Sequence, residues 1–274
     1  RWLTLFYAHL MRRWSWWVII ILAIGIWMTA YFPDLVERWY SNGIFPRIAP
    51  IQRFLLGWLP ISIGDIIYAL LFLALIYQTG LLVYGIIRKR FTRKTLAELL
   101  QRIFFLMLLV YVGFNLLWGL NYNRPSVAMR YQIDVRVPQT AELDTLATDL
   151  IARLEHYAAW ATPGQRDSFN RKKRLFETAV EAYRSVSSDK LIPNYPVASV
   201  KPSLYSYPGN YLGFQGYYNP FTGEAQVNTT IPRVLEPFVT MHEIAHQLGF
   251  AREQEANFIA VLATTSSQIG RAHV

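Results

Sequence analysis

The sequence contains no cysteine among its 274 residues. This absence excludes disulfide scaffolds, thiolate zinc sites, iron–sulfur clusters and cysteine nucleophiles. Charged residues are also scarce, at 16% of the chain, whereas an ordinary soluble domain carries about 25%. Together with nine tryptophans and sixteen phenylalanines, this deficit argues against a wholly cytosolic globular protein and against a disordered chain.

Long uncharged apolar runs occur in residues 1–120. They cover residues 14–32, 66–87 and 103–120. A transmembrane helix needs about 20 consecutive apolar residues, whereas the helices of a soluble bundle would show polar stripes at helical spacing. The sequence therefore predicts a mainly α membrane protein with three transmembrane helices, of which the first is expected to be an uncleaved anchor rather than a signal peptide.

Basic residues predict the orientation of these helices. The short loop between the second and third runs carries Arg88, Lys89, Arg90, Arg93, Lys94 and Arg102. Because Lys and Arg favour the cytoplasmic side, the amino terminus and this loop are expected inside, and the chain after about Asn121 outside, in a multi-pass protein of the plasma membrane. Much of the net charge of +9 then has a topological origin, and no nucleic-acid partner is expected.

The rest of the chain is expected to form a linker, residues 121–138, and an α+β domain, residues 139–268. Leucine spacing predicts amphipathic helices over residues 143–157 and 175–186, while a segment rich in Tyr, Pro and Gly before residue 224 predicts loops and short strands. The last six residues, 269–274, resemble the translation of a sequencing adapter. We expect them to be a non-native tail on a truncated domain, and we assign no function to His273.

His242, Glu243 and His246 form the sequence HEIAH, which is an HExxH motif. On a helix, histidines at positions i and i+4 lie on the same face, so both imidazoles can bind one metal ion. Glu243 is offset in angle from the histidines but close enough to contact a water on that metal. The motif therefore predicts a catalytic zinc site in which Glu243 is the general base.

A catalytic zinc site needs a third protein ligand and one open position. Arg252 stands where metzincins have their third histidine, which disfavours that class. Glu253 and Glu255 are the two candidate ligands, and only one can face the metal because they lie about 200° apart on the predicted helix. Asn257 favours Glu253, since it lies one turn later and could hydrogen-bond a ligand histidine; Glu255 is the alternative.

Two segments, HEIAHQLGFAREQEANFIA and GYYNPFTGEAQVN, resemble the bacterial membrane proteins of domain-of-unknown-function family 3810. The resemblance covers nearly the whole chain. It implies three amino-terminal spans followed by a gluzincin-like zinc-peptidase region with a zincin-like fold, and it implies no particular substrate. The segment EQEAN is also similar to the ExxAD of CAAX-processing membrane peptidases and the ExxSD of thermolysin, in which the first Glu binds zinc; Asn257 replaces their Asp.

A polar and apolar alternation follows the turn at residues 219–223, and it covers Glu224, Ala225, Gln226, Val227 and Asn228. In a zincin the strand before the active-site helix commonly lies along the cleft. A free edge there could bind an extended peptide by main-chain pairing, although an ordinary solvent-facing edge strand explains the pattern equally well. Both interpretations predict an edge strand.

The leading hypothesis is a membrane-anchored zinc metallopeptidase that hydrolyses peptide bonds outside the cytoplasm. One zinc ion would be bound by His242, His246 and Glu253, and candidate oxyanion donors are Tyr217, Tyr218 and Arg252. The expected partners are a peptide or protein substrate and the lipid bilayer, with the oligomeric state left open.

The alternative hypothesis is a non-catalytic, zinc-stabilised binding or scaffold protein at the cell surface. The intact Glu243 argues against it, because a structural zinc site needs no general base. A transporter or channel is disfavoured because the three apolar runs contain no charged residue.

Overall fold

The computed structural model describes residues 13–160, 171–186 and 192–265. The expected tail at residues 269–274 lies outside these residues. The chain divides into two compact units. The first unit comprises the chain up to Phe45 together with Gly64–Arg124, and the second comprises Pro46–Ile63 together with the chain from Pro125 onward. Most described residues are helical, and a single small sheet lies in the second unit.

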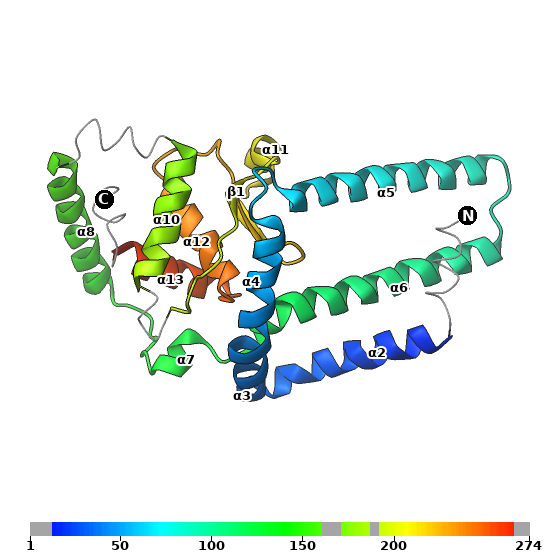
Figure 1. Ribbon diagram of the computed structural model, residues 1–274, viewed down its shortest axis with the longest axis horizontal. Coiled ribbons are helices and arrows are strands. Elements are labelled where there is room, and N and C mark those ends of the chain that lie inside the picture. The colour runs from blue at the N-terminus through cyan, green and yellow to red at the C-terminus, as the bar shows by residue number, and fades with distance from the viewer. Residues whose placement is uncertain (1–12, 161–170, 187–191, 266–274) are drawn as a thin grey trace. The chain divides into compact units, whose positions relative to one another are not determined.

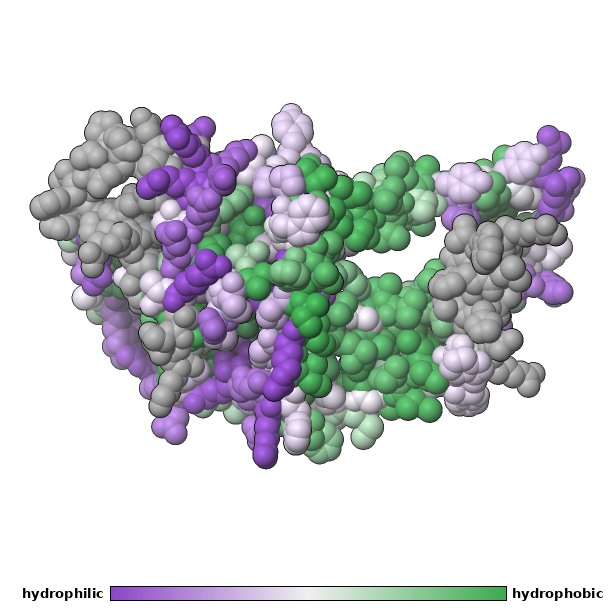
Figure 2. All heavy atoms as spheres, viewed as in Figure 1, coloured by the Kyte–Doolittle hydropathy of each residue, from purple (hydrophilic) through white to green (hydrophobic). Residues whose placement is uncertain are grey.

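The first unit contains three long helices, α2 (Arg13–Met28), α5 (Ile63–Ile87) and α6 (Arg93–Leu117) (Figure 1). All three are long and apolar enough to cross a membrane. Few of their side chains are buried, and Figure 2 shows largely hydrophobic surfaces along them. The three apolar runs of the sequence are thus confirmed as helices, which is compatible with a membrane protein.

Polar side chains join the segment that follows α2 to the segment that follows α6. Four short elements lie there: η1 (Thr29–Tyr31), α3 (Pro33–Leu35), the π-helix η2 (Val36–Ile44) and η3 (Gly119–Asn123). Arg124 makes a two-pronged ion pair with Glu37, with nitrogen–oxygen distances of 2.6 and 2.9 Å. Ser41 Oγ donates to Asn121 Oδ1 at 2.9 Å. The first residues of the expected linker, 121–124, are therefore part of this ordered polar cluster.

The second unit contains helices and a three-stranded sheet. The helices are α4 (Phe45–Leu56), α7 (Val127–Tyr131), α8 (Thr140–Trp160), α10 (Lys172–Val186), α11 (Ser206–Leu212), α12 (Glu236–Gln247) and α13 (Glu253–Thr265), and the strands are β1 (Val200–Pro202), β2 (Gly216–Asn219) and β3 (Glu224–Val227). The expected helices over residues 143–157 and 175–186 are confirmed as α8 and α10. The region before residue 224 holds two strands, as expected, together with the short helix α11.

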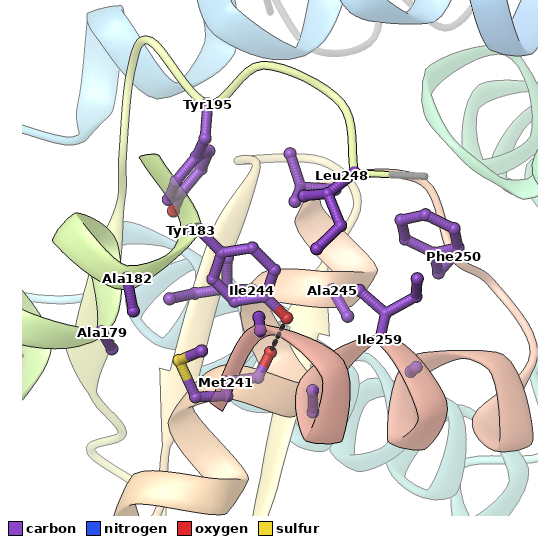
Figure 3. Close-up of a cluster of buried hydrophobic side chains, with 14 of the residues drawn as sticks. Ala179, Ala182, Tyr183, Tyr195, Met241, Ile244, Ala245, Leu248, Phe250 and Ile259 are labelled. Carbon is purple, nitrogen blue, oxygen red and sulfur yellow. Dashed lines mark hydrogen bonds between the residues drawn. The ribbon is translucent and has the colours of Figure 1, made fainter. Parts of the chain in front are cut away.

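The main core of the second unit lies where α10, α12 and α13 pack together (Figure 3). Tyr183 from α10, Met241 and Ile244 from α12 and Ile259 from α13 are almost completely buried. The Tyr183 hydroxyl donates to the backbone oxygen of Met241 at 2.7 Å. Because these contacts cover the apolar face of α12, the opposite face of that helix is left for polar groups.

The sheet has the order β1-β3-β2, with β3 parallel to β1 and antiparallel to β2. The prediction that residues 224–228 form an edge strand is therefore wrong: β3 is the central strand, and all of its residues are buried. The polar side chains that suggested a solvent-facing strand instead bind one another inside the protein. Gln226 Nε2, for example, donates to Ser62 Oγ and to Glu224 Oε2.

Residues 46–63, between the first two apolar runs of the sequence, belong to the second unit. Lys201 on β1 explains much of this attachment. Its ammonium group donates to the backbone oxygens of Leu56 at 2.9 Å and Ile61 at 3.0 Å, and it pairs with Glu224 Oε1 at 2.6 Å. Glu224 also accepts from the backbone N–H of Ile63 at 3.1 Å. Both charges of this buried pair are thus surrounded by hydrogen-bond partners, which is what a buried ion pair requires.

Replacing Lys201 with methionine is expected to destabilise the second unit. The change leaves the buried Glu224 carboxylate without its counter-ion, and breaking a buried pair in this way costs about 3–5 kcal/mol. Near-ultraviolet circular dichroism during thermal unfolding of the detergent-solubilised protein would measure the loss. Lys173→Met is the matched control, because that side chain is 90% exposed. Equal stability of the two variants would contradict the conclusion that the buried Lys201–Glu224 ion pair stabilises the second unit.

Candidate metal centre

Helices α12 and α13 bring His242, His246 and Glu253 together. The two histidines lie one turn apart on α12, and their ring centroids are 4.7 Å apart. Glu253 Oε2 lies 3.2 Å from His242 Nε2, and its Oε1 lies 3.5 Å from His246 Nε2. One ligand atom from each of the three residues falls within 4.8 Å of the others.

The turn between the two helices makes this convergence possible. Gly249 has a φ of 89°, a left-handed conformation that glycine adopts without the penalty of a Cβ atom. The backbone N–H of Phe250 then donates to the oxygen of Ala245 at 3.1 Å, which closes the end of α12. The chain reverses at once, so Glu253 at the start of α13 returns beside the histidines.

The second nitrogen of each imidazole is held by an oxygen atom. His242 Nδ1 lies 2.8 Å from Asn257 Oδ1, and His246 Nδ1 lies 2.7 Å from the backbone oxygen of Phe250. Since these oxygens only accept hydrogen bonds, both Nδ1 atoms carry the hydrogen, and both Nε2 lone pairs face Glu253. The contact between Asn257 and a histidine is the one that the sequence predicted.

Burial and charge set the protonation of these groups. Burial, and then the neighbouring His246, lower the pKa of His242 despite the opposing effect of Glu253. Contact with His246 lowers the pKa of Glu253. An ionised carboxylate therefore lies beside the Nε2 atoms of both imidazoles, and residues of these types can bind one metal ion together.

Glu243 lies next to this cluster but is buried in the protein. Only 4% of the residue is exposed, and its Oε2 has no hydrogen-bond partner within the described part of the chain. Burial, reinforced by the negative charge of Glu253, raises the pKa of Glu243 well above the ordinary value for a glutamate. A carboxyl group with a raised pKa beside a ligand cluster is typical of a general acid or base.

Gly216 on β2 provides the space that Glu243 occupies. A Cβ atom at this position would lie 2.6 Å from Glu243 Oε1 and 2.9 Å from its Cγ. Any larger residue at position 216 must therefore displace the Glu243 side chain. The sequence did not single out Gly216, because the contact joins a strand to a helix that follows it after a long connection.

Glu255, the alternative third ligand, has different partners. Its Oε1 accepts from the backbone N–H of Val127 and from Arg252 Nη1, both at 3.1 Å. The residue is buried, and it is not among the side chains that converge with the histidines. Glu255 thus caps the start of α7, while Glu253 alone of the two lies beside both imidazoles.

Each of the three candidate oxyanion donors has other neighbours in the structure. Arg252 is engaged with Glu255. Tyr218 is buried, and burial raises its pKa, whereas the charge of the nearby Arg53 opposes that shift. The ring of Tyr217 packs edge-on against Phe214, with centroids 5.6 Å apart. Because successive side chains on a strand point to opposite faces, Tyr217 lies on the face of β2 away from Glu243, and its place next to Gly216 does not bring its hydroxyl toward the cluster.

Gln247, the last residue of α12, fixes the helix that carries the histidines. Its side-chain amide donates to the backbone oxygens of Ser199 and Gly223, both at 2.7 Å, and it accepts a short hydrogen bond from the Tyr195 hydroxyl. The backbone oxygen of Gln247 accepts from Arg53 Nη1 at 2.9 Å. The end of α12 is therefore tied to the sheet and to α4, and nothing in the sequence near HExxH indicated the role of Arg53.

A cavity of about 780 Å³ lies elsewhere in the second unit. Its lining includes Val127, Met129, Ile133 and Phe258 together with Glu255. The four residues His242, Glu243, His246 and Glu253 do not line it. This largely apolar hollow is thus separate from the polar cluster, and the two are distinct features of the unit.

Substitution of Glu253 is expected to weaken metal binding far more than the same substitution of Glu255. Glu253→Gln removes the carboxylate beside both imidazoles, whereas Glu255→Gln retains an oxygen that can accept from Val127 and Arg252. Loss even of a group that only supports a ligand costs about 10–100-fold in metal affinity, so we expect at least that loss for Glu253→Gln. Zinc titration with a competing chelator would measure both affinities, and equal affinities would refute the choice of Glu253.

Comparison with known proteins assigns the chain to one family. No curated protein and no solved structure matches this chain. Residues 40–271 match the model of the family described as protein of unknown function (DUF3810), and this range includes all of the residues discussed in this centre. The chain therefore belongs to the DUF3810 family.

Proposed function

We propose that this protein is a membrane-anchored zinc metallopeptidase that hydrolyses peptide bonds outside the cytoplasm. One observation carries the proposal: the Nε2 atoms of His242 and His246 and the carboxylate of Glu253 converge, while the buried carboxyl of Glu243 lies beside them. A purely structural metal site would not require that additional carboxyl group.

The residues of the cluster fit a zinc ion. Two neutral imidazoles and one carboxylate form the ligand set of several zinc peptidases, in which the fourth position stays open. Asn257 and the backbone oxygen of Phe250 would orient the two imidazoles. When bound, zinc would supply Lewis-acid chemistry, polarising the scissile carbonyl and lowering the pKa of a water molecule.

Glu243 would transfer the proton in this reaction. Its Oε2 is the atom without a protein hydrogen-bond partner in the described residues, so it is available to accept a proton from the attacking water. The oxygen of that water forms the new bond to the carbonyl carbon. Oε2 then delivers the proton to the amine nitrogen as the carbon–nitrogen bond breaks. The raised pKa of Glu243 suits a group that must both accept and release a proton near neutral pH.

The strand that could bind substrate is β2 rather than β3. In the described residues β2 lies at one edge of the sheet, and an extended peptide can add to such an edge. Gly216 brings β2 close to Glu243, which would place such a peptide near the proton-transferring group.

The second unit is built from two separate stretches of the chain, and this arrangement supports the proposed membrane topology. Its two parts, residues 46–63 and the chain from residue 125, are bonded to each other and must lie on the same side of a membrane. The three candidate spans meet this requirement, because one precedes residue 46 and two lie between residues 63 and 125, so the chain would cross the membrane twice between the two parts. With the basic loop in the cytoplasm, both parts would lie outside it.

The decisive variant is Glu243→Gln. We expect it to bind zinc at the wild-type stoichiometry but to lose about 10²–10⁴-fold in peptide hydrolysis, the range ascribed to general acid–base catalysis. Metal analysis of the purified full chain and mass spectrometry of a digested peptide library would measure the two properties. Undiminished cleavage by the variant would refute the role of Glu243. A wild-type protein that binds zinc and cleaves nothing would instead favour the scaffold hypothesis.

Gly216→Ala is expected to slow hydrolysis by a different route. The added Cβ would push the Glu243 carboxylate away, and a misplacement of about 1 Å can cost on the order of 10²-fold in rate. Zinc binding should survive, because the atoms nearest that Cβ belong to Glu243 and Gln226 and not to the three ligands. The kcat on any peptide cleaved by the wild type would be compared with that of Gly80→Ala, whose added Cβ would meet no atom within 4 Å. An unchanged kcat for Gly216→Ala would show that Glu243 tolerates displacement.

A further inference from the structure

Helix α4 has two faces of opposite character. One face carries Ala49 and Arg53, which are buried. The other face carries Ile51, Phe54, Leu55 and Trp58, spaced at i, i+3, i+4 and i+7 along the helix and the turn that follows it. Phe54 and Trp58 are 71% and 75% exposed. This second set of four residues, the outer face of α4, contains no charged or strongly polar side chain.

The outer face cannot turn inward to bury itself. Arg53 is held by its bond to the backbone oxygen of Gln247, and Gln52 Nε2 donates to the backbone oxygen of Pro220 at 3.1 Å. The turn after α4 is held in the same way, because Lys201 binds the backbone oxygens of Leu56 and Ile61. These bonds fix the rotation of α4, so its outer face must find a partner outside the unit or remain in water.

The length of the chain places this face close to the membrane. The second candidate span begins at Ile63, five residues after Trp58. Because an extended chain advances at most about 3.6 Å per residue, Trp58 lies within about 18 Å of the start of that span. The preceding candidate span ends at Tyr31, so α4 is connected to a span at both of its ends.

We propose that the outer face of α4, together with the exposed Ile61, lies in the boundary between the lipid headgroups and acyl chains of the outer leaflet. An apolar face on a short helix suits this depth, and tryptophan is enriched at it. The second unit would then be attached to the bilayer by an interfacial helix as well as by its connections to the spans.

This inference rests on the membrane part of the proposed function and not on zinc or catalysis. A lipid surface is preferred to a protein partner because the connections to the spans guarantee that the bilayer is near, whereas nothing in the structure brings a second protein to this face. A second copy of the chain or another protein covering the face is therefore an alternative outcome of the test.

Single-cysteine labelling can test the location of the outer face, because the chain has no cysteine of its own. Phe54→Cys and Trp58→Cys would each be nitroxide-labelled in the full chain and reconstituted into vesicles of phosphatidylcholine and phosphatidylglycerol. Electron paramagnetic resonance would compare access of oxygen, which concentrates in lipid, with access of a water-soluble nickel chelate. Leu73→Cys, within α5, is the control for lipid, and Asp149→Cys, on the exposed surface of α8, is the control for water.

The expected result is a ratio of oxygen access to nickel access at both test positions that lies between those of the two controls. Ratios equal to that at position 149 would overturn the inference and leave the outer face in water. Labels shielded from both reagents would also overturn it, because a protein would then cover the face. A water-like ratio at position 73 would overturn the membrane proposal itself, so failure of that proposal and failure of this inference are distinguishable.

Discussion

The attachment of Gln247 to its surroundings is the interaction on which the candidate centre depends. Gln247 ends α12 one residue after His246, and its side chain and backbone bond to the residues before β1 and β3, to Tyr195 and to Arg53. Each of these partners comes from a different part of the chain. The end of the helix is thus fixed in position, and the tight turn at Gly249 can return Glu253 to a defined place beside the histidines.

A buried polar network extends this attachment into residues 46–63. Lys201 and Glu224 form a pair in which each charge has several hydrogen-bond partners. An ion pair of this kind is costly to bury and costly to break, so it specifies one arrangement more than it adds stability. The second unit, which contains the cluster, is therefore assembled from two separate stretches of the chain. A fragment that began after the third span would lack Arg53 and the backbone oxygens that bind Lys201.

The hydrogen on each imidazole determines which of its two nitrogens can bind a metal ion. Asn257 and the backbone of Phe250 accept from the two Nδ1 atoms, so both Nε2 lone pairs face the Glu253 carboxylate. In the proposed function these three ligand atoms would hold the zinc ion. Glu243, which directly follows His242 on the same helix, is kept out of this set by its angular position and is buried against Gly216 instead. The same short segment of α12 therefore supplies the two imidazoles of the cluster and, in the proposed mechanism, a separate proton carrier.

Local sequence determined the elements and the spacing within them. The apolar runs predicted the long helices of the first unit, the HExxH spacing placed two imidazoles on one face of α12, and the four-residue step from Glu253 to Asn257 anticipated the contact with His242. These features depend on helical periodicity, which is visible in a single segment. Only the tertiary structure made β3 a central strand, joined Arg53 to Gln247 across 194 positions, and placed Gly216 against Glu243. Such contacts pair residues that are distant in the chain, and because a polar side chain looks the same whether its partner is water or a buried group, local sequence carries no sign of them.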